Sequence, residues 1–302
     1  MKRAFAIASI TAGCAHPGAP CPEPATPGPT PSMTIPLLDY REGLLAIDVD
    51  VADKTERFLF DTGAGVTTVS PEIAHRLGCT PAGRVTGFRM SAERLDLPTC
   101  RDVDLRLGAD SFRHEIVSVL DVGKLLPPDW PKVAGVISLA TLENRCVTLS
   151  LAERTLTVES TSTCAAKKRE ATAIRSRVAR TSGGAAIGLF VAMGTPKHPQ
   201  WFLLDSGNVG ATIVAPHAAS FLNVDLARAK HEPKSAERPE SWQLSSVSIP
   251  MVHEPRAPFA VDILVKDIIY DGALGTAYMG HWRYTIDLRT NGGIWVTPSQ
   301  PK

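Results

Sequence analysis

The sequence predicts an all-β protein made of two related halves, and three observations lead to this fold class. The 302 residues include 24 Pro and 23 Gly, which suits a chain with many turns, and 44% are apolar, enough for a sizeable core. Short segments such as 47–51 and 103–107 alternate apolar and polar residues, the period of a strand with one buried face, whereas helical periodicity of any length is hard to find. The third observation is an internal repeat.

The first 13 residues predict a secretory signal peptide. Met1-Lys2-Arg3 precedes a short run of small and apolar residues that ends at Gly13. The tetrapeptide 11–14 resembles a bacterial lipobox ending at Cys14, although Thr11 stands where Leu is usual. Three interpretations stay open: lipidation at Cys14, simple cleavage, or a start that is uncleaved or misassigned. We expect export to the bacterial cell envelope, either the periplasm or the outer membrane.

Composition then divides the rest of the chain. Residues 14–35 are rich in Pro and poor in large apolar side chains, which predicts an extended tether. We expect an N-terminal β lobe over 36–160 and a C-terminal β lobe over 183–300. Residues 161–182 carry six Lys and Arg residues and predict a solvated basic linker, with an anionic docking patch as the less favoured alternative.

Charge and cysteine usage exclude several classes of function. The net charge of +1 argues against nucleic-acid binding, and without an apolar run of 18 residues the only membrane contact we expect is a lipid at Cys14. In an oxidising compartment the spacings Cys79/Cys100 and Cys146/Cys164 each allow a local disulfide, although sequence cannot fix the pairing. There is no CxxC motif and no His pair at zinc spacing, so we expect no metal and no cofactor.

The internal repeat contains three elements in one order. Residues 58–70 and 202–214 each have an apolar triplet, then Asp-Thr-Gly or Asp-Ser-Gly, then a β-branched run that leads to a Pro. Further on, 135–139 matches 272–276, and 147–151 matches 284–288. After the first copy, Ser70-Pro71 predicts the start of a short helix that runs through Leu77 and is closed by Gly78. The repeat predicts two halves of one ancestral fold.

The residues of the paired tripeptides suit a close approach of two turns. Gly63 and Gly207 allow a tight turn after a buried strand and let backbone N–H groups approach a carboxylate. Thr62 and Ser206 offer hydroxyls that can bond across a twofold axis and lock the turns together. These four residues are expected to support the site.

Asp61 and Asp205 would then face each other where the two halves meet. Two carboxylates a few ångström apart share one proton, because ionising both is costly. The charged member can act as a general base on a water molecule, and the protonated member can polarise a carbonyl, a mechanism known from aspartic proteases.

The sequence resembles the pepsin/retropepsin superfamily of aspartic peptidases, as a bacterial exported member with two lobes. The similarity lies in 58–64, in 202–207, and in 271–275, the apolar-apolar-Gly element that packs beneath a catalytic loop. It implies two homologous β-barrel-like lobes with a cleft between them, and an aspartic endopeptidase with catalytic Asp61 and Asp205. The implied partner is a protein or peptide substrate. Since one chain supplies both Asp residues, we expect a monomer.

Some residues depart from the family pattern. Ser138 stands where a Gly is expected and could crowd the loop that carries Asp61, and Asn208 replaces a small or hydroxyl residue. Residues 85–90 are the best candidate for a flap, or equally an ordinary hairpin; 232–242 could be its counterpart or a loose loop. Ser138 and the indistinct flap keep open a non-catalytic relative that binds a peptide or partner in the same cleft. An unrelated two-domain β binding protein is the third hypothesis.

Overall fold

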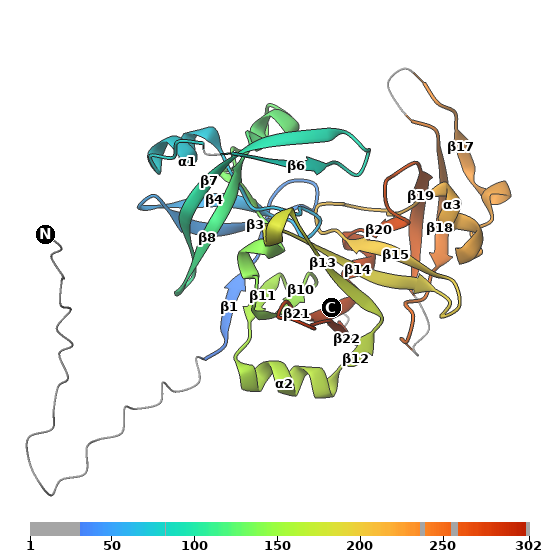
Figure 1. The fold of residues 1–302 in the computed structure, drawn as a ribbon. Helices are drawn as coiled ribbons and strands as arrows, with labels where there is room; N and C mark the ends of the chain where they lie inside the picture. Colours follow the sequence, from blue (N-terminus) through green and yellow to red (C-terminus); the bar gives the residue numbers. More distant parts are fainter. Residues whose placement is uncertain (1–30, 82, 236–238, 255–258, 300–302) are drawn as a thin grey trace, which may run out of the picture. The chain divides into compact units, whose positions relative to one another are not determined.

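The computed structural model describes residues 31–299 except 82, 236–238 and 255–258. The predicted signal peptide, Cys14, Cys21 and most of the tether lie outside this part of the chain, as does the tip of the segment 232–242. The described chain is mostly β, which confirms the predicted fold class, and its strands fall into three sheets (Figure 1).

The first sheet contains eight strands in the order β2-β3-β4-β9-β5-β8-β7-β6. Its strands are β2 (Leu38–Asp39), β3 (Leu45–Val51), β4 (Lys54–Phe60), β5 (Thr68–Val69), β6 (Arg84–Phe88), β7 (Arg94–Leu107), β8 (Asp110–Val119) and β9 (Gly135–Ile137). The short helices in this region are α1 (Pro71–Arg76), η1 (Val122–Leu125) and η2 (Leu139–Leu142).

The second sheet also contains eight strands, in the order β13-β14-β15-β20-β16-β19-β18-β17. Its strands are β13 (Ser176–Thr181), β14 (Ala186–Gly194), β15 (Pro199–Leu204), β16 (Thr212–Val214), β17 (Lys230–Glu232), β18 (Ser241–Ser248), β19 (Ala260–Lys266) and β20 (Gly272–Leu274). Its short helices are η3 (Ser182–Gly184), α3 (Pro216–Ala219), η4 (Ser220–Leu222), η5 (Leu226–Arg228) and α4 (Thr276–Met279).

The two sheets share one local topology, which gives the sequence repeat a structural meaning. In the first, β4 runs parallel to β9, and β9 pairs antiparallel with β5, which is parallel to β8. In the second, β15, β20, β16 and β19 repeat these relations in the same order. The matched segments 135–139 and 272–276 begin with β9 and β20, whose residues are fully apolar or Gly because both strands are buried at the centre of their sheets.

The third sheet joins the two halves, in the order β1-β11-β10-β21-β22-β12. Its strands are β1 (Met33–Pro36), β10 (Cys146–Ser150), β11 (Thr155–Val158), β12 (Thr172–Ile174), β21 (Trp282–Asp287) and β22 (Ile294–Pro298). The third repeated element lies at its centre, where Thr148 pairs directly with Thr285. Strand β1 begins inside the segment 14–35, for which the sequence predicts a tether. Its Met33 pairs with Val158 of β11, and its apolar Ile35 is buried in the core.

The segment 161–182 forms regular structure, although its charge predicts a solvated connector. It contains helix α2 (Thr161–Glu170), β12 and β13. Ser160 caps the first turn of α2 by accepting a hydrogen bond from the Thr163 N–H (3.1 Å). Three basic residues occupy the last turn, where positive charge is favourable at a helix C-terminus. Charge alone could not reveal this helix, since its main anchor to the core is the buried Cys164.

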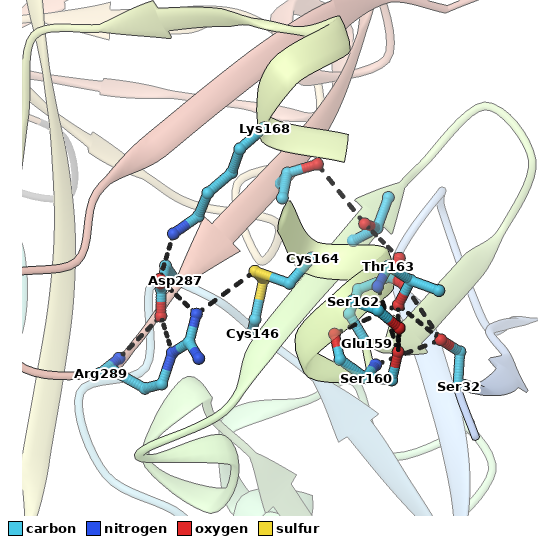
Figure 2. The surroundings of a disulfide bond; sticks show 12 residues. Ser32, Cys146, Glu159, Ser160, Ser162, Thr163, Cys164, Lys168, Asp287 and Arg289 are labelled. Atoms are coloured by element: carbon cyan, nitrogen blue, oxygen red, sulfur yellow. Dashed lines mark hydrogen bonds and ion pairs between the residues drawn. A yellow bond between two sulfur atoms is a disulfide. The ribbon is translucent and has the colours of Figure 1, made fainter. Parts of the chain in front are cut away.

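Figure 2 shows the disulfide and the ion pair that link α2 to β10 and β21. A disulfide joins Cys164 of α2 to Cys146 of β10. The carboxylate of Asp287, the last residue of β21, accepts from Lys168 and from the guanidinium of Arg289 (2.7 and 2.8 Å). These two cations hold the pKa of Asp287 below its usual range, against the opposing effect of burial.

The other local elements follow the sequence closely. The disulfide Cys79–Cys100 is also present, so both bridges that the spacing allows are formed. The predicted helix after Ser70 is confirmed as α1, with the Ser70 hydroxyl accepting from the Ile73 N–H. Within the described residues, no helix has the length and apolar character needed to span a membrane.

Candidate active site

Each of the two Asp-containing turns follows a strand, and the two strands occupy equivalent positions in their sheets. Asp61 directly follows β4, and its N–H donates to the carbonyl of Ile137 at the end of β9 (3.0 Å). Asp205 directly follows β15, and its N–H donates to the carbonyl of Leu274 at the end of β20 (3.0 Å). A buried parallel strand therefore fixes the point at which each carboxylate leaves its sheet.

Reciprocal hydrogen bonds join the two turns. The N–H of Thr62 donates to Ser206 Oγ, and the N–H of Ser206 donates to Thr62 Oγ1, both at 3.0 Å. The Thr62 hydroxyl donates to the carbonyl of Leu204 (2.8 Å), and the Ser206 hydroxyl donates to the carbonyl of Phe60 (3.3 Å). Both hydroxyls are buried, so these bonds satisfy groups that water cannot reach. This is the cross-twofold lock that the sequence predicts.

Gly63 and Gly207 each face the carboxylate of the opposite half. A Cβ on Gly207 would lie 2.6 Å from Asp61 Oδ2, and a Cβ on Gly63 would overlap the carboxylate of Asp205. Neither position has room for any side chain. Because these two glycines have no side chain, the backbone of each turn can approach the carboxylate of the opposite half, as the sequence predicts.

The two carboxylates accept hydrogen bonds from backbone N–H groups, one of which they share. Asp61 Oδ1 accepts from the N–H of Gly63 (2.8 Å) and of Gly207 (3.1 Å). Asp205 Oδ1 accepts from the N–H of Gly207 (3.0 Å) and of Asn208 (3.1 Å). The N–H of Gly207 thus donates to both carboxylates, which places Asp61 Oδ1 and Asp205 Oδ1 side by side. The structure therefore brings the two predicted Asp residues together at one backbone N–H.

Burial and mutual repulsion control the charge of this pair. Burial, and then the negative charge of Asp61, raise the pKa of Asp205, whose exposed fraction is only 7%. Burial also raises the pKa of Asp61, but backbone N–H groups, the first from Gly63, oppose this by stabilising its anion. Asp61 is the more exposed of the two. The balance favours a proton on Asp205 and a negative charge on Asp61.

Ser138 does not crowd the loop that carries Asp61, contrary to the expectation from sequence. Its buried hydroxyl lies 3.1 Å from Thr67 Oγ1 and accepts from the N–H of Ala140 (3.2 Å), so it caps η2 and braces the loop. The equivalent Gly275 has no such room, because a Cβ there would lie 2.6 Å from the carbonyl oxygen of Asn208. The two halves therefore need different residues at this position.

The predicted flap segment 85–90 forms one arm and part of the turn of a hairpin. β6 pairs antiparallel with β7, with Phe88 opposite Arg94. At the turn, the carbonyl of Met90 accepts from the N–H of Ile269 in the second half (3.1 Å). The hairpin thus reaches across to the half that carries Asp205, which an isolated surface hairpin would not do. In the segment 232–242, Glu232 pairs with Ser241 across β17 and β18.

Sequence reasoning did not single out Tyr270, which lies two residues before the repeated element 272–276. It packs on the apolar cluster that contains Leu203, two residues before Asp205. One signal could have found it: residue 133, at the same place in the first half, is a Val, so an aromatic hydroxyl distinguishes the second half. Among the described residues, no group of three or more His, Cys, Asp or Glu is placed to bind a metal ion.

Comparisons with known proteins agree with this geometry. Residues 47–129 match the family model described as aspartyl protease. Basic 7S globulin from soybean has a similar solved structure, with a TM-score of 0.52 over 90% of this chain and 96% of that chain. Its sequence identity is 8%, so this likeness concerns the fold alone. A search of curated proteins gives no match. The family match over 47–129 agrees with the resemblance to aspartic peptidases, and the structural likeness shows the fold.

Proposed function

We propose that the protein is an aspartic endopeptidase in which Asp61 and Asp205 activate a water molecule for hydrolysis of a peptide bond. The observation that carries this proposal is that the two carboxylates share the N–H of Gly207 as a hydrogen-bond donor, while Asp61 also accepts from Gly63 and Asp205 from Asn208. The family match over 47–129, which includes Asp61, supports the same class of hydrolase.

The charges of the pair assign the two roles. Asp61 is the general base that takes a proton from the water, since its anion is stabilised by the N–H groups of Gly63 and Gly207. Asp205 holds the shared proton and polarises the scissile carbonyl, since burial and the Asp61 charge favour its neutral form. Because the carboxylates interact strongly, the two pKa values belong to the pair.

The supporting residues keep this geometry fixed without taking part in proton transfer. Thr62 and Ser206 join the two turns through buried hydrogen bonds, and Gly63 and Gly207 leave room for the opposite carboxylate. Such preorganisation matters because misplacing a catalytic group by about 1 Å can cost about 100-fold in rate.

The test is cleavage of denatured casein by the purified mature protein between pH 3 and pH 7, with and without pepstatin. Turnover that pepstatin inhibits is expected, and Asp61→Asn and Asp205→Asn should each abolish it while circular dichroism stays unchanged. A lack of turnover at every pH would contradict the proposal. Binding of peptide without cleavage would then favour a non-catalytic relative that uses the same site.

The location of the protein is a separate proposal, supported by the sequence of residues 1–14. We propose export to the bacterial cell envelope with a lipid anchor at Cys14. Replacing Cys14 by Ser should move the protein from the membrane fraction to the soluble envelope fraction. An unchanged distribution would exclude the anchor and leave simple cleavage.

A further inference from the structure

The side chains of β15 divide between two faces, and one face is continuous with Asp205. Phe202 and Leu204 point into the main core, whereas Leu203 belongs to a separate cluster. Since side chains alternate along a strand, Leu203 and Asp205 share a face. The cluster around Leu203 therefore lies on the face of β15 that leads to Asp205.

This small cluster has an equivalent in the first half. It comprises five buried residues: Leu203, Ile213, Ala215, Ile268 and Ala273. The first half has a corresponding cluster of four: Leu59, Val122, Val133 and Val136. Leu59 and Leu203 each lie two residues before an Asp, so each half has an apolar cluster on the strand that leads to its carboxylate.

Tyr270 on the second cluster differs from Tyr40 on the first, because the Tyr40 hydroxyl already donates to the carbonyl of Pro131. Tyr270 is partly buried on the second cluster, and its ring meets that of Phe190 edge to face, with centroids 5.3 Å apart. Among the described residues, none forms a hydrogen bond with its hydroxyl. The pKa of Tyr270 is raised, first by burial and then, once Asp205 has lost its proton, by the charge of that carboxylate. The phenol therefore stays protonated and is available as a donor near the carboxylate pair.

The hairpin β6–β7 adds a second contact to this place. Met90 packs on the same cluster as Tyr270, and its carbonyl accepts from the N–H of Ile269, the residue before Tyr270. The chain that carries Tyr270 is thus held on one side by Phe190 and on the other by the hairpin turn. A donor held in this way loses little rotamer freedom when it binds a ligand.

We propose that Tyr270 is a substrate-binding residue whose hydroxyl donates a hydrogen bond to a backbone carbonyl of a peptide bound at Asp61 and Asp205, on the Asp205 side. This inference rests on the proposed function, because it takes an extended peptide as the ligand. The hydroxyl supplies a polar contact among apolar residues. Because it binds a backbone carbonyl, it fixes the position of the peptide substrate whatever side chains that substrate carries.

The test compares Tyr270→Phe with Tyr40→Phe as a matched control. Both variants lose one tyrosine hydroxyl, and Tyr40 is also partly buried, with its ring edge to face against Trp130. The Tyr40 hydroxyl already donates to the carbonyl of Pro131, so its loss should lower the melting temperature without changing kcat/KM. Tyr270→Phe should lower kcat/KM and weaken pepstatin binding about three- to tenfold, the effect of one neutral hydrogen bond, with an unchanged melting temperature.

The outcomes separate this inference from the proposed function. If the wild type cleaves casein and Tyr270→Phe matches it in kcat, KM and pepstatin affinity, the role of Tyr270 is overturned while the function stands. If the wild type binds pepstatin without cleaving, Tyr270→Phe should still weaken binding, and equal affinity overturns the inference. If the wild type neither binds nor cleaves, both proposals fail.

Discussion

At the scale of single residues, two glycines decide whether the carboxylates can meet. Replacing Gly207 by Ala would place a methyl group 2.6 Å from Asp61 Oδ2 and force the pair apart. We expect kcat/KM on casein to fall by about 100-fold or more, since a catalytic group would be displaced by about 1 Å. Gly293→Ala is the control, because a Cβ there finds its nearest atom at 3.5 Å. Equal activity of both variants would contradict this account of the turn.

The raised pKa of Asp205 predicts a pH dependence of stability. A carboxyl group that binds its proton more tightly when folded stabilises the fold fully below its unfolded pKa, about 4. This contribution is lost as the pH rises through the folded pKa, and each tenfold difference in proton affinity corresponds to about 1.4 kcal/mol.

The measurement is the free energy of unfolding by urea from pH 4 to pH 8, for the wild type and for Asp205→Asn. Asn cannot ionise, so the variant lacks this part of the pH dependence, while contributions from other groups are common to both proteins. The wild type should therefore lose stability relative to the variant as the pH rises. A constant difference between them would show that the Asp205 proton is not held by the fold.

At the scale of elements, helix α2 depends on an ion pair at the end of β21. The side chain of Asp287 is 7% exposed, and its partners Lys168 and Arg289 are 22% and 41% exposed. Asp287→Asn leaves these cations without their anion. We expect the free energy of unfolding at pH 7 to fall by about 2–3 kcal/mol. This is less than the loss for a fully buried ion pair, because solvent screens the partly exposed cations.

The pH dependence of this effect has the opposite sign to that of Asp205. The pKa of Asp287 is lowered in the folded protein, so its contribution is present above the usual aspartate pKa and is lost as the pH falls. Asp48→Asn is the control, since the pair Arg57–Asp48 is 42% and 45% exposed and should cost less than about 1 kcal/mol. Similar losses in both variants at pH 7 would contradict the role assigned to Asp287.

At the scale of the whole molecule, one chain supplies both carboxylates, and this predicts a site that needs no second copy. The central pairing of β10 with β21 joins the two halves within the chain. The specific activity per chain should therefore be constant from nanomolar to micromolar protein. A fall in specific activity on dilution, measured with gel filtration at the same concentrations, would indicate that the active species contains more than one chain.

The sequence predicts those features that depend on short segments. Ser70-Pro71 predicts α1 because helix capping depends on neighbouring residues. The apolar triplets before Asp61 and Asp205 predict buried strands because three consecutive apolar residues favour a strand that is buried on both faces. Helix α2 is missed because it has no apolar stripe and relies on Cys164 and Lys168 contacting other elements. The crowding expected at Ser138 is wrong because the size of its site depends on Thr67, 71 residues away.

What the sequence by itself determined is the duplicated β architecture and the residues of its two acidic turns, since a repeat and a Gly-containing turn are patterns along the chain. Only the tertiary structure decided which cysteines pair, that Asp61 and Asp205 share the N–H of Gly207, and that Tyr270 packs with Met90 of a distant hairpin on the cluster that contains Leu203. The physical reason is that these contacts join residues far apart in sequence, and their geometry depends on how whole sheets pack.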